Sequence, residues 1–204
     1  MSLSPTSHAL LGLLSLRAWT TYELTQQARR SLRFLFPRAE RHLYAEAKRL
    51  AVAGLARTEE SYTGKRKSRT YSITPAGRKA LREWLRTPPE ALVLEAEVLL
   101  RSFFGDLGRQ QDLLAALESA RDQAVDAQRE LAALAESAVD GTAPFPDRNA
   151  VGALTMRFVT DFHRMIEERS AWAATEVATW DDASGRNWAA SSEIYADIAS
   201  RNRP

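Results

Sequence analysis

The stretch of the sequence with the clearest chemistry is a short run of positive charge. Lys65, Arg66, Lys67 and Arg69 lie within five residues, directly after a glycine. Ammonium and guanidinium groups at this density are typical of polyanion binding, because each neutralises a phosphate and releases condensed counterions. A solvated loop would have the same composition, so the surrounding segments must decide between the two interpretations.

The charge of the chain is divided between its two halves. Residues 1–90 contain 17 Lys and Arg against 7 Asp and Glu, whereas residues 91–204 contain 11 against 19. The net charge of +2 therefore conceals a basic half and an acidic half. This division predicts a polyanion-binding module joined to a part with another role, with chance clustering on two solvated surfaces as the alternative.

Few residues offer any other chemistry. The chain has no cysteine, which excludes disulfides and thiol catalysis and fits a reducing cytoplasm. His8, His42 and His163 lie in separate segments without the spacing of a metal site, and the sequence patterns of common hydrolases and nucleotide-binding loops are absent. We expect no enzyme activity, cofactor or metal. No leader pattern or bilayer-spanning run is seen, so a soluble cytoplasmic protein with no membrane partner is expected.

Two helices are predicted near the N-terminus. Ser4-Pro5 combines a capping hydroxyl with proline at the first helical position, which predicts a helix over 5–17. Thr20 and Glu23 have the spacing of a capping box, which predicts a second helix over 21–30.

A third helix is predicted from Pro37 to Gly54, because glycine commonly follows the end of a helix. Its apolar residues share one side at helical spacing. These residues are Leu43, Ala47 and Leu50. The opposite side is basic and, at Ala45, small. This pattern predicts a helix that packs by one face and can approach a large ligand closely by the other.

Two strands and a fourth helix complete the basic half. Strands are predicted over 55–62 and 69–74, joined by the basic turn, and Thr74-Pro75 begins a helix. Pro88-Pro89 closes the unit. Three helices, a two-stranded wing and a fourth helix are the element order of a winged helix-turn-helix, so residues 1–88 are predicted to be a DNA-binding domain.

In that fold the third helix enters the major groove and the wing faces the phosphate backbone. Arg38, Arg41 and His42 lie towards the N-terminal end of this helix, where recognition helices usually meet base edges. An ordinary exposed helix face for the arginines and a space-filling role for His42 are the alternatives. The predicted DNA-binding residues are Thr21, Tyr22, Arg38, Arg41, His42, Tyr44, Lys48, Lys65, Arg66, Lys67 and Arg69.

Several short motifs of the basic half occur together in one known family. They are Leu43-Tyr44, Lys48-Arg49-Leu50, Gly54-Leu55, Tyr71-Ser72-Ile73-Thr74 followed by Gly77, and Leu81 with Trp84-Leu85. Through them residues 5–86 resemble the PadR-like transcriptional regulators. The resemblance implies a dimeric, sequence-specific DNA-binding repressor with a C-terminal dimer interface, in which Tyr44 contacts DNA near the backbone. The family usually has small residues where this chain has Arg38-Ala39-Glu40-Arg41, so its operator sequence does not carry over.

Residues 89–204 are predicted to form an all-helical domain. Helices are expected over 92–107, 110–139, 149–180 and 186–200, with a loop over 140–148. The helix over 110–139 has an apolar seam that alternates steps of four and three, as in a coiled coil. The seam consists of Leu113, Leu117, Ala120, Ala124, Ala127, Leu131, Leu134 and Ala138.

An isolated helix pair with exposed seams would be unstable, so the second subunit of a homodimer is the expected partner. The predicted dimerisation residues are Leu113, Leu117, Ala124, Leu131, Leu134, Phe158, Phe162 and Met165. Packing of these helices on their own winged domain is the alternative.

Tryptophans gather in the last quarter of the chain, at Trp172, Trp180 and Trp188. Aromatic walls between helices commonly hold flat apolar ligands, which predicts a site for a small apolar or aromatic effector at Trp172 and Trp180. Tryptophans that simply fill a dimer core are the alternative.

The sequence as a whole predicts a homodimeric transcriptional regulator, most consistent with a repressor on a pseudo-palindromic operator. Two alternatives remain. A regulator of the multiple-antibiotic-resistance type would need a long helix before the first winged-domain helix. A winged domain used for protein interaction or assembly would give no reason for arginines both on the third helix and at the hairpin tip.

Overall fold

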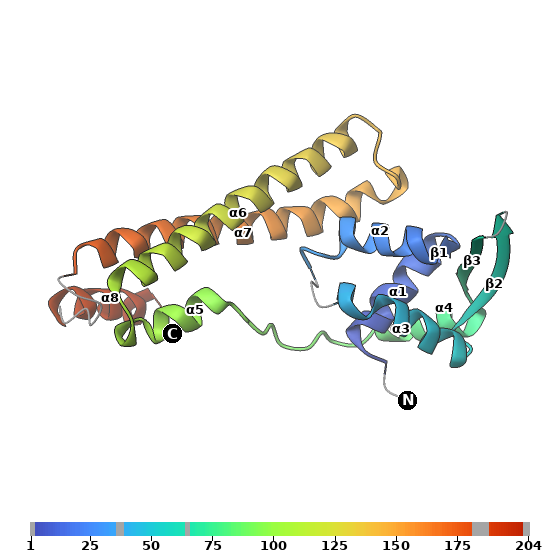
Figure 1. Ribbon diagram of the computed structural model, residues 1–204, viewed down its shortest axis with the longest axis horizontal. Helices are drawn as coiled ribbons and strands as arrows, with labels where there is room; N and C mark the ends of the chain where they lie inside the picture. The colour runs from blue at the N-terminus through green and yellow to red at the C-terminus, as the bar shows by residue number, and fades with distance from the viewer. Residues whose placement is uncertain (1–2, 36–38, 64–65, 181–187, 202–204) are drawn as a thin grey trace. The chain divides into compact units, whose positions relative to one another are not determined.

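The computed structural model describes residues 3–35, 39–63, 66–180 and 188–201 (Figure 1). Its contacts divide the chain into two compact units, residues 1–92 and 93–204. Unit 1 combines helices with a three-stranded antiparallel sheet, and the helices and turns of unit 2 contain no strand within the residues described. The predicted class, mainly helical with an N-terminal winged helix-turn-helix, is confirmed.

Unit 1 has the predicted element order with one addition. Its elements are α1 (Pro5–Leu16), β1 (Trp19–Thr20), α2 (Thr21–Ser31), α3 (Ala39–Val52), β2 (Ala56–Thr63), β3 (Arg66–Ile73) and α4 (Pro75–Trp84). The sheet order is β1-β3-β2, and β1 pairs Trp19 with Tyr71 and Thr20 with Thr70. The sequence analysis missed β1, because two residues are too few to show an alternation.

The starts of α1, α2 and α4 use the predicted caps. The side chains of Ser4 and Thr20 each accept a hydrogen bond from the backbone N–H three residues later. The side chain of that later residue accepts a hydrogen bond from the backbone N–H of the cap residue, which completes a capping box. In the capping box of α1 the later residue is Ser7. Thr74 caps α4 by accepting from the Gly77 N–H at 3.1 Å. These bonds satisfy N–H groups that have no partner inside the helix.

The core of unit 1 lies between α1, the inner face of α3 and the sheet. The side chains that the third helix was predicted to bury, Leu43, Ala47 and Leu50, are almost fully buried. Between them lies a buried carboxylate, Glu46, which accepts a hydrogen bond from the Ser7 hydroxyl and pairs with Arg49 at 3.2 Å. Because an unpaired buried carboxylate is costly, the bond from Ser7 fixes α3 against the start of α1.

A stacked pair of rings joins α1 to α4. The rings of His8 and Trp84 lie 4.6 Å apart between centroids and 9° from parallel. Within the described residues, the Nδ1 atom of His8 is buried and has no hydrogen-bond partner. Burial lowers the pKa of His8, since the charged form would lose its hydration. The contact is therefore that of a neutral imidazole on an indole.

The end of α3, the end of β3 and the start of α4 meet at one residue, Leu55. Gly54 has φ 71°, the Leu55 N–H bonds to the Leu50 carbonyl and the Gly54 N–H bonds to the Ala51 carbonyl, which is a Schellman motif. The Leu55 carbonyl then accepts from the Thr74 N–H at 3.1 Å. The ending of α3 at Gly54 was predicted, whereas the start at Pro37 lies outside the described residues.

Unit 2 is built on a long helical hairpin. Its elements are α5 (Glu97–Phe103), the 3-10 turn η1 (Gly105–Leu107), α6 (Gln110–Val139), the 3-10 turn η2 (Pro146–Arg148), α7 (Asn149–Ala178) and α8 (Trp188–Arg201). Helices α6 and α7 pack side by side and antiparallel (Figure 1). Gln110 closes the open end of this hairpin, since its side-chain amide donates at 2.7 Å to the carbonyls of Val177 and Trp180.

The predicted helix over 92–107 is confirmed only over Glu97–Phe103, which is followed by the 3-10 turn Gly105–Leu107. Residues 88–96 have no regular structure, and only Glu97–Phe103 is α-helical. Ala96 at the N-cap offers no capping side chain, and the side chains of Leu92 and Val93 are exposed. An apolar stretch forms a stable helix when its face packs on another element, and among the described residues these side chains find no such surface.

We predict that Gly77→Ala destabilises unit 1. A Cβ built at Gly77 overlaps the Leu55 carbonyl oxygen and lies 2.9 Å from Cγ1 of Ile73. The cost should be about 1–3 kcal/mol, as for other overpacked sites. Gly12→Ala in α1 is the control, because nothing lies within 4 Å of its Cβ, and it should gain about 0.5–1 kcal/mol. Thermal and urea unfolding measure both, and equal stability of the two variants would contradict the close approach.

Candidate nucleic-acid interface

The outer face of α3 is open to solvent, opposite its buried side. Tyr44 is 57% exposed, and Ala45 and Lys48 are exposed beside it. Two further residues of the predicted interface, Arg41 and His42, belong to the first turn of α3, but their side chains lie outside the described part, as does Arg38 altogether. Ala45 has a small side chain, so the middle of this face does not project from the helix. A partner with a broad surface can therefore approach the helix backbone here.

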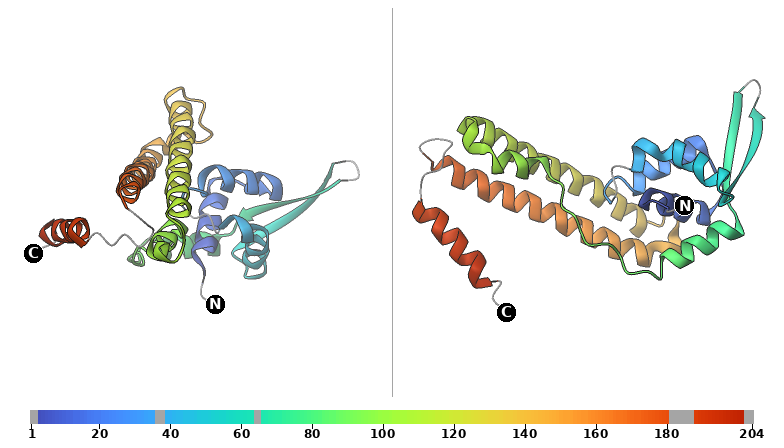
Figure 2. Two further views of the ribbon diagram at one scale, coloured as in Figure 1. Left: turned by 60° about the vertical axis from the view of Figure 1, so that its left-hand side comes forward. Right: turned by 90° about the horizontal axis from the view of Figure 1, so that it is seen from below.

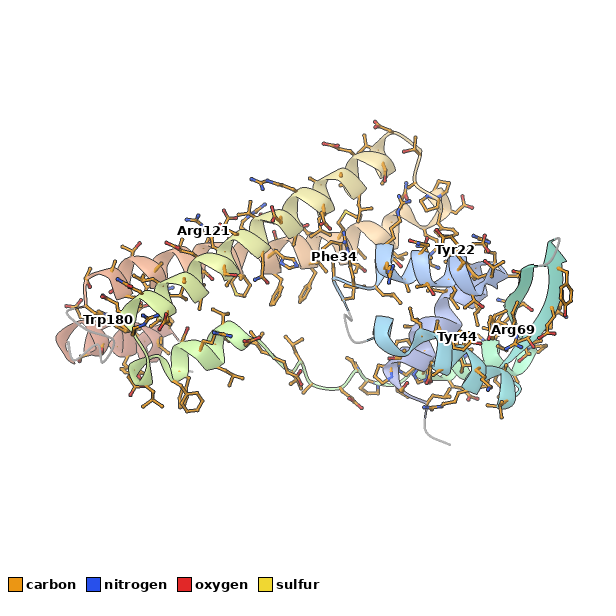
Figure 3. The ribbon with its side chains drawn as sticks, in the orientation of Figure 1. Tyr22, Phe34, Tyr44, Arg69, Arg121 and Trp180 are labelled. Atoms are coloured by element: carbon orange, nitrogen blue, oxygen red, sulfur yellow. The ribbon has the colours of Figure 1, made fainter. Side chains whose placement is uncertain are left out.

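The start of α2 lies against the base of the wing. Thr21 donates a hydrogen bond from its hydroxyl to the Arg69 carbonyl at 3.3 Å, which joins the first turn of α2 to β3. The next residue, Tyr22, is 67% exposed. Figure 3 shows three residues of the predicted interface on three elements of unit 1: Tyr22 on α2, Tyr44 on α3 and Arg69 on β3. A phosphate near the first turn of α2 would also meet the positive end of the helix dipole.

The wing is the β2–β3 hairpin, which extends beyond the helices of unit 1 (Figure 2). Its register runs from the Ala56–Ile73 pair to the Thr63–Arg66 pair. The strands are therefore longer towards the tip than the sequence predicted. Lys65 lies outside the described residues, as do the side chains of Arg66 and Lys67, whose backbone belongs to β3.

The stem of the wing carries ion pairs. Arg69 donates to Glu60 across the strands at 2.7 Å, and Arg57 lies 3.7 Å from Glu59. The hydrogen bond from Arg69 to Glu60 is the main reason that the pKa of Arg69 is raised above its usual range. Arg69, a predicted DNA contact, thus already has a carboxylate partner.

Tyr62 was missed by the sequence analysis. It is 68% exposed near the tip of β2 and lies opposite Lys67 in the register. The strand period of two places it on the same face as Thr58 and Glu60. The predicted strand over 55–62 included Tyr62, and this alternation places it on the face that continues from buried Ala56, where it lies beyond the core as an exposed aromatic of the wing.

The seam of α6 is occupied within the chain. Leu113, Leu117, Ala124 and Leu131 are buried, and Leu134 is half-buried. Because α6 packs along α7, these side chains already have an intramolecular partner. A four-three seam fits an antiparallel hairpin of one chain as well as a pair of chains, so the assignment of these residues to an interface between subunits stays a prediction.

A second apolar stripe, on α7, is exposed. Its members recur at helical spacing and are Leu154, Phe158, Phe162, Met165 and Trp172. Phe158 is 67% exposed, and the ring of His163 lies edge-on to that of Phe162 with centroids 5.7 Å apart. Partial burial lowers the pKa of His163, so its neutral form is favoured beside this stripe.

The two tryptophans of the predicted effector site have different surroundings. Trp180 packs against the buried cluster of Leu113, Leu117 and Val177 at the open end of the hairpin. Trp172 instead lines a cavity of about 550 Å³ between α7 and α8. The other lining residues are Arg169, Glu193, Ile194, Asp197, Ile198 and Arg201. Trp188 begins α8, and its side chain lies outside the described residues.

Other kinds of site find no support in the described ranges. No group of three or more histidine, aspartate or glutamate side chains is placed there to hold a metal ion. Among the helices whose residues are described, none combines the length and apolar character needed to cross a membrane.

The fold has well-matched counterparts among solved structures. The protein smu.1604c from Streptococcus mutans UA159 aligns with a TM-score of 0.73 at 18% identity, over 83% of this chain and 98% of that chain. The PadR-like transcriptional regulator BC1756 from Bacillus cereus aligns with a TM-score of 0.69 at 17% identity, over 86% and 97%. Comparison with models of protein families and with curated sequences found no match.

Bacillus subtilis PadR aligns in two bound states. In complex with operator DNA it has a TM-score of 0.68 at 17% identity, over 84% of this chain and 98% of that chain. In complex with p-coumaric acid it has a TM-score of 0.63 at 17% identity, over 87% of this chain and 99% of that chain. The chain has the PadR-like fold. The alignments span 97–99% of the PadR-like chains. The structural likeness therefore extends well beyond residues 5–86, the segment over which the sequence resembles the family.

Proposed function

We propose that this protein is a DNA-binding transcriptional regulator. The observation that carries the proposal is the joint placement of the exposed face of α3, the start of α2 and the wing on one compact unit. Tyr44 and Lys48 lie on α3, Tyr22 lies on α2, and a hydrogen bond from Thr21 joins α2 to the wing. The PadR-like fold, which binds operator DNA in the Bacillus subtilis protein, supports the same function.

In this proposal α3 occupies the major groove. Arg38, Arg41 and His42 contact base edges from its N-terminal end, and Tyr44 and Lys48 contact the backbone. Thr21 and Tyr22 approach a phosphate from the start of α2. Lys65, Arg66 and Lys67 approach a second stretch of backbone from the wing. Blocking of a promoter by such binding is repression, which is the mode of regulation that we propose.

The regulator acts as a homodimer on a pseudo-palindromic site. Two reading helices must lie about 34 Å apart to enter successive major grooves, and a fixed dimer maintains that distance. The dimer contact is proposed on the exposed α7 stripe, with Phe158, Phe162 and Met165 at its centre. Exposed aromatic and apolar side chains at regular helical spacing are typical of an interface that a second subunit covers.

A small aromatic effector would bind at the cavity beside Trp172. The indole supplies an apolar wall, and Ile194 and Ile198 supply another. The Bacillus subtilis PadR complex with p-coumaric acid supports a ligand of this size. Trp180 is assigned to the hairpin core, because it packs on the Leu113 cluster and not on the cavity.

The DNA-binding proposal predicts the effect of removing the wing cations. Lys65→Ala with Arg66→Ala and Lys67→Ala should weaken binding to every duplex and flatten the dependence of log K on log salt. Each lost phosphate contact should reduce the slope by roughly 0.9. Fluorescence anisotropy with a random 30-base-pair duplex, and with duplexes tiled across the DNA upstream of the coding sequence, measures this.

A matched control removes three arginines from unit 2. Arg121→Ala, Arg129→Ala and Arg157→Ala change the net charge equally but should leave the slope unchanged. If the wild-type protein binds none of these duplexes, the DNA-binding function is wrong, and a winged domain that contacts another protein becomes the better interpretation.

The dimer proposal predicts different outcomes for the two apolar stripes. Phe158→Glu with Met165→Glu should give folded monomers, because both side chains are exposed within one chain. Leu117→Asp should instead unfold the hairpin, at a cost of several kcal/mol for an unpaired buried charge. Light scattering after size exclusion measures mass, and circular dichroism measures helix content. A double variant that remains dimeric would place the interface elsewhere.

The effector proposal predicts that Trp172 is required for ligand binding. p-Coumaric acid is the first compound to test, by quenching of tryptophan fluorescence and by calorimetry. Trp172→Ala should abolish binding, whereas Trp180→Phe should lower stability and leave binding intact. Equal affinity of the Trp172→Ala variant and the wild-type protein would exclude this cavity.

A further inference from the structure

The ion pair between Glu60 and Arg69 lies where the wing leaves the core. The strand β1 ends at the Thr20–Thr70 pair, so beyond it the hairpin continues as two strands only. Glu60 and Arg69 form the next cross-strand pair of the register, directly past that end. The guanidinium Nη2 and the carboxylate Oε1 lie 2.7 Å apart.

This ion pair lies on the face of the hairpin that continues from the core. Side chains of opposite residues in an antiparallel pair lie on one face, and every second pair shares it. Glu60 and Arg69 therefore share a face with Thr58 and Tyr71, of which Tyr71 is fully buried. The Arg69 carbonyl also accepts the hydrogen bond from Thr21 at the start of α2. Arg69 thus lies at the junction of the two elements proposed to contact the DNA backbone.

In the stem of the wing, the part of the hairpin next to the core, each arginine lies beside a glutamate of opposite charge. Arg69 is paired with Glu60, and Arg57 lies beside Glu59 on the opposite face. An arginine already held by a carboxylate adds little to the attraction of a distant polyanion. A phosphate that approaches Arg69 also approaches Glu60, and two negative charges at close range repel each other. The carboxylate therefore opposes loose association of DNA with the stem.

The guanidinium of arginine has more hydrogen-bond donors than one carboxylate can accept. It carries five N–H groups in a planar fork, so one edge can bind Glu60 while another reaches a phosphate oxygen. That arrangement requires the phosphate to lie at a defined position relative to the wing, as in a fully docked complex. Random DNA, which is held loosely and mainly by charge, does not meet this requirement.

We propose that Glu60 is a specificity-determining residue, which masks Arg69 from the phosphates of non-specific DNA and admits only a correctly docked duplex. The inference rests on the proposed DNA-binding function. It assigns the general attraction for DNA to the wing tip, and it assigns to Arg69 a contact that forms after docking.

The test compares four variants of the full chain by fluorescence anisotropy across a salt series. The probes are a random 30-base-pair duplex and the tightest-binding duplex from the upstream tiling. Glu60→Gln should tighten binding to random DNA several-fold and steepen its salt slope by roughly 0.9, the value for one added phosphate contact. The tightest-binding duplex should gain less, so the ratio of the two affinities should fall.

Arg69→Gln and the combined Glu60→Gln, Arg69→Gln variant provide the second readout. Arg69→Gln alone should weaken binding to both probes, because it leaves the Glu60 carboxylate unneutralised, and the tightest complex should lose more because the docked contact of Arg69 is also removed. The combined variant should return the slope on random DNA to the wild-type value. Thermal melting confirms that each variant retains its fold.

Glu59→Gln is the matched control, since it removes the same charge from the neighbouring residue on the opposite face. It should change the slope far less than Glu60→Gln. Equal effects of these two substitutions, or an unchanged slope in Glu60→Gln, would overturn the masking role while leaving the DNA-binding function intact. A wild-type protein that binds neither probe would overturn both.

Discussion

The arrangement of unit 1 depends on the two backbone hydrogen bonds of Leu55. Its N–H ends α3 by bonding to Leu50, and its carbonyl accepts from Thr74, where β3 ends and α4 begins. The Thr74 hydroxyl also donates to the Gly54 carbonyl at 2.7 Å. Only a hydrogen atom at Gly77 fits against this carbonyl. Because these bonds tie the three elements to Gly54 and Leu55, α3, the wing and α4 cannot shift independently here.

This constraint explains how a short exposed helix and a slender hairpin can form one surface. The buried face of α3 and the Glu46–Ser7 bond set the rotation of the helix about its axis, which leaves Tyr44 and Lys48 outside. The strand register then sets which wing residues continue the core face. The chemistry of the surface comes from side chains, but their positions come from backbone bonds and packed apolar groups beneath them.

Much of this was readable from the sequence because it rests on local signals. Caps at Ser4, Thr20 and Thr74 and the glycine after α3 depend on residues a few positions apart. The Glu60–Arg69 pair and the two-residue β1 depend instead on register and on contacts across the sheet, which no local pattern encodes. The seam of α6 was identified correctly, but periodicity cannot say which helix fills it. Likewise Trp172 and Trp180 look alike in sequence, and only packing separates them.

The closure of the α6–α7 hairpin by Gln110 limits how this domain can change in length during evolution. Both helices have 30 residues, and the Gln110 amide at one end of α6 donates to the Val177 carbonyl of α7 and to the Trp180 carbonyl just after it. Seven residues inserted into α6 alone would move its start by about 10.5 Å and remove that cap. Insertion of a heptad into both helices keeps the seam and the cap together. Longer and shorter relatives should therefore differ by paired insertions, one in each helix, at equal distances from the 140–148 turn.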